Sequence, residues 1–176
     1  MELYCFGESG HSYKAALALQ LSEIDWTPIF VDFFNGETRS EQYRNQINEM
    51  GEAPVLVDGD TKLTQSGVIQ NYLFNKTGKH GGRDEAEKLE ILRWVLWDNH
   101  KLSSFAGNTR FLMNFFPQDR RPQPVIDFNL ARLKGSYGIL EKALIGKDFL
   151  VGDDITHADM TCCAYLYYPE PFGFER

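Results

Sequence analysis

Two serines, Ser9 and Ser12, stand where an extended segment gives way to a helical one. A hydroxyl just before a helix can accept a hydrogen bond from a backbone N–H, and it can also donate to an anion held at the helix N-terminus. From the spacing alone, a helix cap is the simpler interpretation of both serines. Because neither position carries sulfur, the Ser-x-x-Ser motif cannot perform thiol–disulfide exchange.

A second helix start carries Gln65 and Ser66. The N–H groups and the dipole of a helix N-terminus together bind a carboxylate, and a serine hydroxyl can join them. The alternative is that Ser66 only caps the helix. Upstream, Pro54 either begins a strand, which the bare sequence favours, or follows a cis bond to Ala53.

The elements that must position these residues form a strand–helix–strand unit followed by a hairpin and a helix. A crossover between the first two strands implies that they pair in parallel. We expect strands at residues 2–6, 27–31 and on both sides of Asp58-Gly59-Asp60, and helices at 12–23, 38–46 and from Ser66 onward.

The composition changes at Gly78–Arg83, a glycine-rich break that we take as a domain boundary. Beyond it the pattern predicts one long helix over residues 84–116, kinked near Gly107, and another over residues 125–145. Thr156 and Asp159 then form a capping box at the start of a last helix. The second half is therefore expected to be all-helical.

The net charge of −7 argues against binding to nucleic acid or to an anionic membrane surface. Three cysteines without metal-ligand spacing predict neither a disulfide framework nor a metal site, and they fit a reducing cytoplasm. The chain shows no signal-peptide pattern and no long apolar run, so we expect neither export nor a membrane span.

Four motifs, in this order along the chain, resemble those of the cytosolic glutathione S-transferases of the serine-type, bacterial-like branch. The motifs are Ser9-Gly-His-Ser12, Gly51-Glu-Ala-Pro-Val55, Thr64-Gln-Ser66 and Phe149-Leu-Val-Gly-Asp-Asp-Ile-Thr-His-Ala-Asp159. The resemblance implies a thioredoxin-like domain over residues 1–79, with the order βαβ-ββα and a cis Pro54, followed by a helical domain over residues 84–176. Relatives normally continue through further helices, so we expect a shortened C-terminus or an end that is absent from this chain.

The resemblance also implies the roles of individual residues. Ser9 is the catalytic residue, which stabilises the glutathione thiolate together with the N-terminus of the first helix. The other implied glutathione contacts are Ser12, Thr38, Arg39, Glu52, Ala53, Pro54, Gln65 and Ser66. A plain helix cap remains the preferred interpretation of Ser12, and Arg39 can equally be a solvated side chain. The implied electrophile pocket holds Trp97, Lys101 and Phe105, although aromatic stripes more often form a core or a subunit interface. Thr156 and Asp159 serve folding.

The implied activity is conjugation of glutathione to small hydrophobic electrophiles, a detoxification reaction carried out by a cytoplasmic homodimer. Glutathione is the co-substrate, and no tightly bound cofactor or metal is expected. Two alternatives stay open: a non-catalytic module that binds glutathione, and a glutathione-dependent isomerase resembling the zeta branch.

Overall fold

The computed structural model describes residues 1–169. Residues 170–176, which end the expected helical domain, lie outside the described residues. The chain divides into two compact units, the first ending at Gly81 and the second beginning at Gly82.

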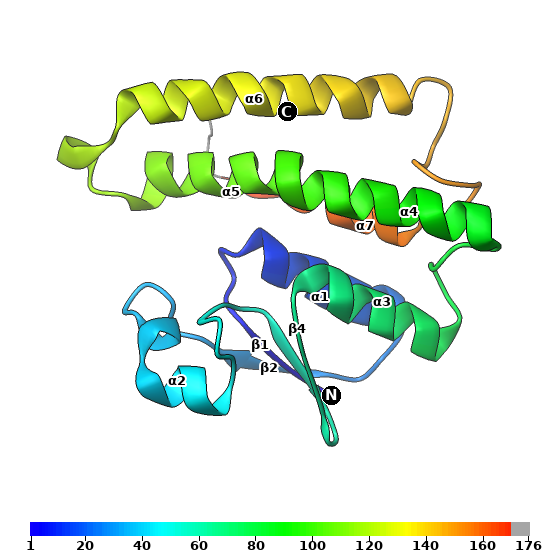
Figure 1. Ribbon diagram of the computed structural model, residues 1–176, viewed down its shortest axis with the longest axis horizontal. Coiled ribbons are helices and arrows are strands. Elements are labelled where there is room, and N and C mark those ends of the chain that lie inside the picture. Colours follow the sequence, from blue (N-terminus) through cyan, green and yellow to red (C-terminus); the bar gives the residue numbers. More distant parts are fainter. Residues whose placement is uncertain (170–176) are drawn as a thin grey trace. The chain divides into compact units, whose positions relative to one another are not determined.

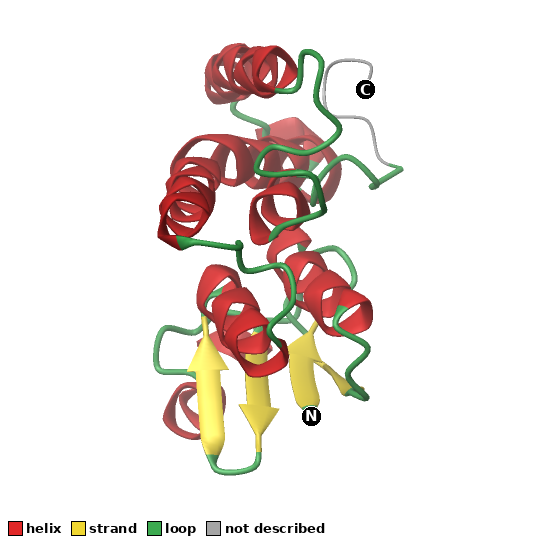
Figure 2. Ribbon diagram, turned by 90° about the vertical axis from the view of Figure 1, so that its right-hand side faces the viewer, coloured by secondary structure: helices red, strands yellow, loops and turns green. Residues whose placement is uncertain are grey.

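A four-stranded sheet forms the base of the first unit (Figures 1 and 2). The strands lie in the order β2 (Thr27–Phe30), β1 (Glu2–Cys5), β3 (Val55–Asp58) and β4 (Thr61–Thr64). β1 pairs in parallel with β2 and antiparallel with β3, and β3 pairs antiparallel with β4. Gly59 joins β3 to β4 with a φ of +59°, a conformation that glycine adopts without steric cost. The expected hairpin is therefore present.

Two helices, α1 (Gly10–Leu21) and α3 (Ser66–Thr77), pack against each other over the sheet (Figure 2). Small residues such as Ala15 and Ala18 are fully buried in α1 and allow this close approach. The short helix α2 (Glu41–Gln46) lies apart from them, after a 3-10 turn, η1 (Glu37–Arg39) (Figure 1). The core of this unit includes Leu3, Leu19, Leu56, Ile69 and Leu73.

The second unit is helical, as expected, and α6 runs alongside α5 (Figure 1). Its elements are α4 (Glu85–Trp97), η2 (Asp98–Leu102), α5 (Ser103–Arg110), η3 (Phe111–Phe115), η4 (Gln118–Arg120), α6 (Gln123–Ala143) and α7 (His157–Cys162). Leu102, Leu133 and Met160 are fully buried and form its core. No helix within residues 1–169 is both long and apolar enough to cross a bilayer.

The expected long helix is interrupted by π-turns at η2 and η3, and Gly107 lies between them within α5. At η2 the Ser103 hydroxyl donates to the Asp98 carboxylate at 2.8 Å, and the Ser103 N–H donates to the Asp98 carbonyl oxygen. These two bonds hold the wider five-residue turn. Gly107 has another use, because a β-carbon there would lie 2.8 Å from the hydroxyl oxygen of Tyr165. Glycine thus lets Tyr165 pack directly against α5.

Candidate functional site

Ser9 is the N-cap residue of α1 and has extended backbone dihedral angles. Its Oγ accepts the backbone N–H of Ser12 at 3.1 Å, and its own N–H donates to the Phe6 carbonyl oxygen at 3.2 Å. The Ser9 side chain is only partly buried. A hydroxyl that accepts from the helix still carries one proton that it can donate outward. Capping the helix and contacting a ligand are therefore compatible roles for Ser9.

Ser12 lies one turn into α1 and is only 3% exposed. Its hydroxyl oxygen is buried, and within the described part of the chain it has no hydrogen-bond partner. Its backbone N–H, by contrast, holds the Ser9 oxygen. The geometry gives Ser12 a way to orient Ser9 through its backbone.

The start of α3 lies against the start of α1. Ser66 is the first residue of α3, and its Oγ lies 3.2 Å from Nδ1 of His11 in the first turn of α1. Gln65, the N-cap of α3, adopts a φ of +67° and makes no side-chain capping bond. The two helix N-termini thus meet through the side chains of His11 and Ser66.

The loop before β3 contains the cis peptide bond between Ala53 and Pro54. The carbonyl oxygen of Glu52 accepts the Tyr43 hydroxyl at 3.0 Å and the Asn48 amide at 2.9 Å. Burial, helped by the charge of a neighbouring glutamate, raises the pKa of Tyr43 to about 12, so this hydroxyl stays protonated and donates. These bonds fix the backbone immediately before Ala53.

Glu52 and Gln65, two of the predicted contacts, are brought together directly. Nε2 of Gln65 donates to the Glu52 carboxylate at 2.9 Å and also lies 3.6 Å from the sulfur of Met50. Both Glu52 and Gln65 are exposed. The bond joins the N-terminus of α3 to the loop that carries the cis peptide.

Thr38 and Arg39 lie in η1, where their side chains differ in accessibility. Thr38 is 2% exposed, whereas Arg39 is exposed. The Thr38 carbonyl oxygen lies against Gly51, and the Arg44 guanidinium lies beside the same glycine. Thr38 therefore supports the loop before Ala53, and Arg39 presents a charge to solvent.

An aromatic cluster of Phe6, Phe33 and Phe34 adjoins the turn that carries Ser9. The rings of Phe6 and Phe33 stack with centroids 4.6 Å apart, and Phe34 meets both edge-on. Phe34 remains 45% exposed. The Phe6 carbonyl oxygen accepts the Ser9 N–H, so the backbone of the cluster adjoins the backbone of that turn.

The thiol nearest in sequence to this turn belongs to Cys5, in β1. Burial raises the pKa of the Cys5 thiol above its ordinary value, and Cys5, Cys162 and Cys163 are all free cysteines. A raised pKa lowers the fraction of reactive thiolate. Cys5 is thus poorly suited to act as a nucleophile. Among residues 1–169, no cluster of three or more histidine, cysteine or acidic side chains could hold a metal ion.

In the second unit, Trp97, Lys101 and Phe105 are partly exposed. Trp97 packs edge-on against Trp94, with centroids 5.3 Å apart. The π-turn at η2 separates Trp97 from Phe105, so an α-helical spacing does not place them on one face. The three side chains therefore come from three successive elements, Trp97 from α4, Lys101 from η2 and Phe105 from α5.

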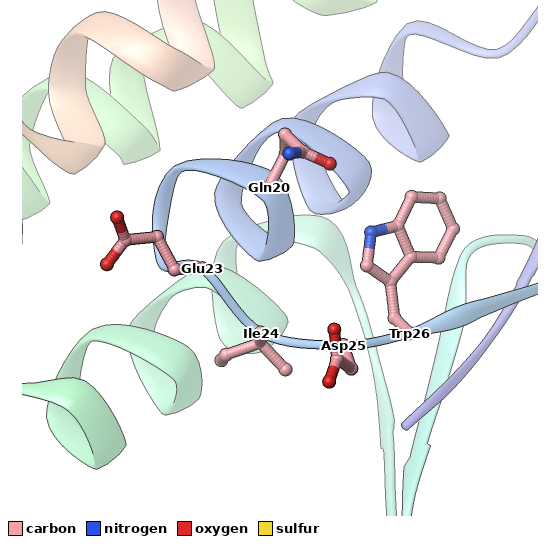
Figure 3. A pocket seen from close by; sticks show the side chains of 5 residues that line it. All are labelled: Gln20, Glu23, Ile24, Asp25 and Trp26. Carbon is pink, nitrogen blue, oxygen red and sulfur yellow. The ribbon is translucent and has the colours of Figure 1, made fainter.

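A surface hollow of about 380 Å³ lies at the far end of α1 (Figure 3). It is lined by Gln20, Glu23, Ile24, Asp25 and Trp26. The twelve residues of α1 separate it from Ser9 by roughly 18 Å, at 1.5 Å per residue. This hollow is therefore separate from the helix start that carries Ser9.

Three structural features near the candidate site were missed by sequence reasoning: the contact of His11 with Ser66, the Phe6–Phe33–Phe34 cluster and Arg44 beside Gly51. His11 lies inside the Ser9–Ser12 motif, and this position was a usable signal. The contact between His11 and Ser66 spans 55 residues of sequence, so local patterns could not reveal it.

The sheet and helices of the first unit define a thioredoxin-like domain, in which the Ser9 hydroxyl lies at the start of α1 and the start of α3 lies beside it. A helical unit follows in sequence. Residues 1–75 match the glutathione S-transferase N-terminal domain, and residues 109–175 match the glutathione S-transferase C-terminal domain. The chain belongs to the cytosolic glutathione S-transferase family. The predicted family and fold are thus confirmed.

Individual proteins are also similar to this chain over most of its length. Glutathione S-transferase F14 of Arabidopsis thaliana is 26% identical over 96% of this chain and 68% of its own length. The disulfide-bond oxidoreductase YfcG of Escherichia coli is 27% identical over 94% of this chain and 79% of its own length. A glutathione transferase from Burkholderia graminis, whose structure holds two glutathione molecules per subunit, superimposes with a TM-score of 0.84 at 23% identity, over 94% of this chain and 70% of that one.

Proposed function

We propose that this protein is a glutathione transferase that conjugates the glutathione thiolate to small hydrophobic electrophiles. The observation that carries the proposal is the geometry of Ser9, whose oxygen accepts a helix N–H at 3.1 Å while its proton remains available. The residue range 1–79 is the proposed glutathione-binding domain, and 84–176 is the proposed helical domain. Family membership and the glutathione bound to a structural relative support this assignment.

The Ser9 hydroxyl and the N-terminus of α1 can supply the free energy needed to lower the thiol pKa of bound glutathione. Lowering a thiol pKa from about 8.5 by about 2 units requires about 2.7 kcal/mol. A hydrogen bond to a charged group contributes roughly 1.5 to 3 kcal/mol, and a helix N-terminus roughly 0.3 to 1 kcal/mol. Together the Ser9 hydroxyl and the first turn of α1 supply roughly 2 to 4 kcal/mol, a range that covers this requirement.

In the proposed reaction, the glutathione thiol loses its proton to solvent and the thiolate accepts the Ser9 hydrogen bond. The sulfur then forms a bond to the electrophilic carbon, and the leaving group departs with the electron pair of the bond that breaks. The cluster of Phe6, Phe33 and Phe34 offers apolar surface for the electrophile. Trp97, Lys101 and Phe105 remain proposed electrophile contacts from the helical unit.

The rest of glutathione is assigned to the remaining polar groups of the first unit. Ser66, Gln65 and the start of α3 take the γ-glutamyl carboxylate, and the backbone of Ala53, before the cis Pro54, pairs with the cysteinyl part. Arg39 offers a charge to the glycine carboxylate, while Thr38, Glu52 and Ser12 support these contacts.

A homodimer is proposed on the outer face of α4. Leu89, Leu92 and Leu96 recur at spacings of three and four, and they are 67%, 50% and 62% exposed. Such a row of exposed leucines is costly in water unless a partner covers it. A second copy of this chain is the proposed partner, and the free cysteines are consistent with a reducing cytoplasm.

The test is a comparison of Ser9→Ala with Ser9→Thr, which keeps the hydroxyl. The pKa of bound glutathione is followed by the ultraviolet absorbance of the thiolate, and turnover is measured with an activated aryl chloride. We expect Ser9→Ala to raise that pKa by about 1 to 2 units and to slow turnover roughly 10- to 100-fold. If both quantities stay at the wild-type value while glutathione still binds, Ser9 has no catalytic role. Wild-type protein that binds glutathione but shows no turnover would instead be a non-catalytic module. Turnover of a cis maleyl compound to its trans isomer would instead favour the zeta-like alternative.

A further inference from the structure

His11 and Ser66 connect the first turn of α1 to the first residue of α3. Nδ1 of His11 lies 3.2 Å from Oγ of Ser66, and Ser66 is only 7% exposed. A second link joins the same helices, because Nε2 of Gln70 donates to the Lys14 carbonyl oxygen at 3.3 Å. Lys14 lies three residues after His11, and Gln70 lies four residues after Ser66. The two helices therefore run in the same direction with their N-termini together.

The imidazole of His11 is neutral at physiological pH. Burial, reinforced by the charge of Lys14, lowers its pKa to about 4. A neutral imidazole carries one proton, and the hydrogen bonds around the ring decide which nitrogen holds it. Nδ1 of His11 can therefore face Ser66 either as a donor or as an acceptor.

The two tautomers leave Ser66 in different states. If Nδ1 is unprotonated, the Ser66 hydroxyl donates its single proton to the ring and keeps none for a ligand. If Nδ1 carries the proton, Ser66 accepts from His11, and its own proton can be donated elsewhere. An ionised carboxylate only accepts hydrogen bonds, so it favours the second state.

We propose that His11 is a positioning residue: by donating its Nδ1–H to Ser66, it directs the Ser66 hydroxyl proton to the γ-glutamyl carboxylate of glutathione. This inference rests on the proposed binding of glutathione at the start of α3. The arrangement repeats the logic of Ser9, whose oxygen accepts from the protein and whose proton is available to the ligand. In each case a group on α1 holds the serine oxygen.

The experiment compares His11→Leu, His11→Asn and Ser66→Ala by titration calorimetry. The asparagine amide can donate from nearly the position of Nδ1, whereas leucine cannot. Two ligands are used: glutathione, and γ-aminobutyryl-cysteinylglycine, which lacks the carboxylate assigned to Ser66. Circular dichroism establishes that each variant is folded.

We expect His11→Leu to weaken glutathione binding about 10-fold and His11→Asn to restore it to within about 3-fold of wild type. The analogue should bind wild type and His11→Leu equally. Adding His11→Leu to Ser66→Ala should cause no further loss of glutathione affinity, because the two residues act through one hydrogen bond. Long-range ¹H–¹⁵N spectra of the wild-type complex should show the proton on Nδ1.

The inference is overturned if Ser66→Ala weakens glutathione binding and His11→Leu does not. It is also overturned if His11→Leu weakens glutathione and the analogue to the same extent, since that result describes a general disturbance of α1. Should His11→Leu fail to fold, an unprotonated Nδ1 in the wild-type complex would overturn it. If wild-type protein binds neither ligand, the proposed function itself is wrong.

Discussion

Gly51 lies so close to Thr38 that a β-carbon on Gly51 would stand 2.8 Å from the Thr38 carbonyl oxygen. Real β-carbons do not approach an oxygen this closely, and the φ of Gly51 is +68°, which side chains rarely adopt. Glycine is therefore required twice at this position, once for its backbone conformation and once for its size. The loop that follows leads directly to the cis peptide bond before Pro54.

Gly51→Ala should destabilise the fold by about 2 to 5 kcal/mol, because the left-handed conformation costs roughly 1 to 2 kcal/mol and overpacking adds roughly 1 to 3 kcal/mol. Gly59→Ala is the matched control, with a φ of +59° but nothing within 4 Å of the new β-carbon. At Gly59, alanine should cost only the roughly 1 to 2 kcal/mol of the left-handed backbone conformation. Urea denaturation measures both losses, and equal losses would contradict the steric part of the argument.

Asp159 joins the start of α7 to the preceding loop. Its carboxylate accepts the N–H and the hydroxyl of Thr156 at 2.8 and 2.9 Å, and the N–H of Leu150 at 2.7 Å. We expect Asp159→Ala to cost about 3 kcal/mol, since several donors lose a charged acceptor, and Thr156→Ala to cost about 1 kcal/mol. Chemical denaturation provides the comparison. A smaller loss for Asp159→Ala than for Thr156→Ala would refute this account.

The lowered pKa of the partly buried His11 imidazole predicts a loss of stability in mild acid. Its folded-state pKa of about 4 lies below the ordinary value of 6.5, so between these values the unfolded chain binds more protons. Stability must therefore fall as the pH drops from about 6.5 towards about 4. Between pH 7 and about pH 5, this one group should cost about 2 kcal/mol.

His11→Asn removes the titrating group and serves as the control for this pH dependence. Carboxylates whose pKa is lowered by ion pairs, such as Glu87 beside Arg83, also lose stabilising interactions in acid. These carboxylates affect wild type and His11→Asn equally, so their contribution cancels in the difference between the two unfolding free energies. Unfolding free energies of the two proteins that fall in parallel with pH would show that His11 is not the source.

If the row of Leu89, Leu92 and Leu96 on α4 forms the dimer interface, a charge placed within it should separate the two copies. Leu92→Glu places a charge in the middle of the proposed interface, and we expect it to convert dimers into monomers in light-scattering measurements. Ile145→Glu is the control, because Ile145 is 76% exposed and lies beyond the end of α6. Dimers that persist in Leu92→Glu, or a wild-type monomer, would exclude this face as the interface.

Short sequence patterns, such as turn and capping residues, predicted most of the strands and helices. Asp58-Gly59 predicts its hairpin because the turn chemistry is contained in the turn itself, and Thr156 and Asp159 predict a helix start for the same reason. The π-turn at Asp98 depends on side-chain bonds within a continuous helical pattern, so periodicity did not reveal it. The close approach of Tyr165 to Gly107 could not be predicted, because the two residues are distant in sequence.

In the candidate site, too, some residues could be predicted from local sequence and others could not. Ser9 and Ser66 are recognisable as helix starts from composition, whereas the link from His11 to Ser66 depends on how α1 and α3 pack. The link from Gln65 to Glu52 likewise requires two loops to meet in space. Sequence reasoning therefore found the residues that begin elements but missed the contacts that connect one element to another, and with them His11.

The parallel course of α1 and α3 has an electrostatic consequence. Each helix carries a partial positive charge, equivalent to roughly half an elementary charge, at its first turn, and here two such ends of like sign are neighbours. Their mutual repulsion opposes folding, and a negative ion bound near both ends would offset it. Sulfate or phosphate should therefore protect the first unit against heat more than chloride does at equal ionic strength, even without any sulfur-containing peptide.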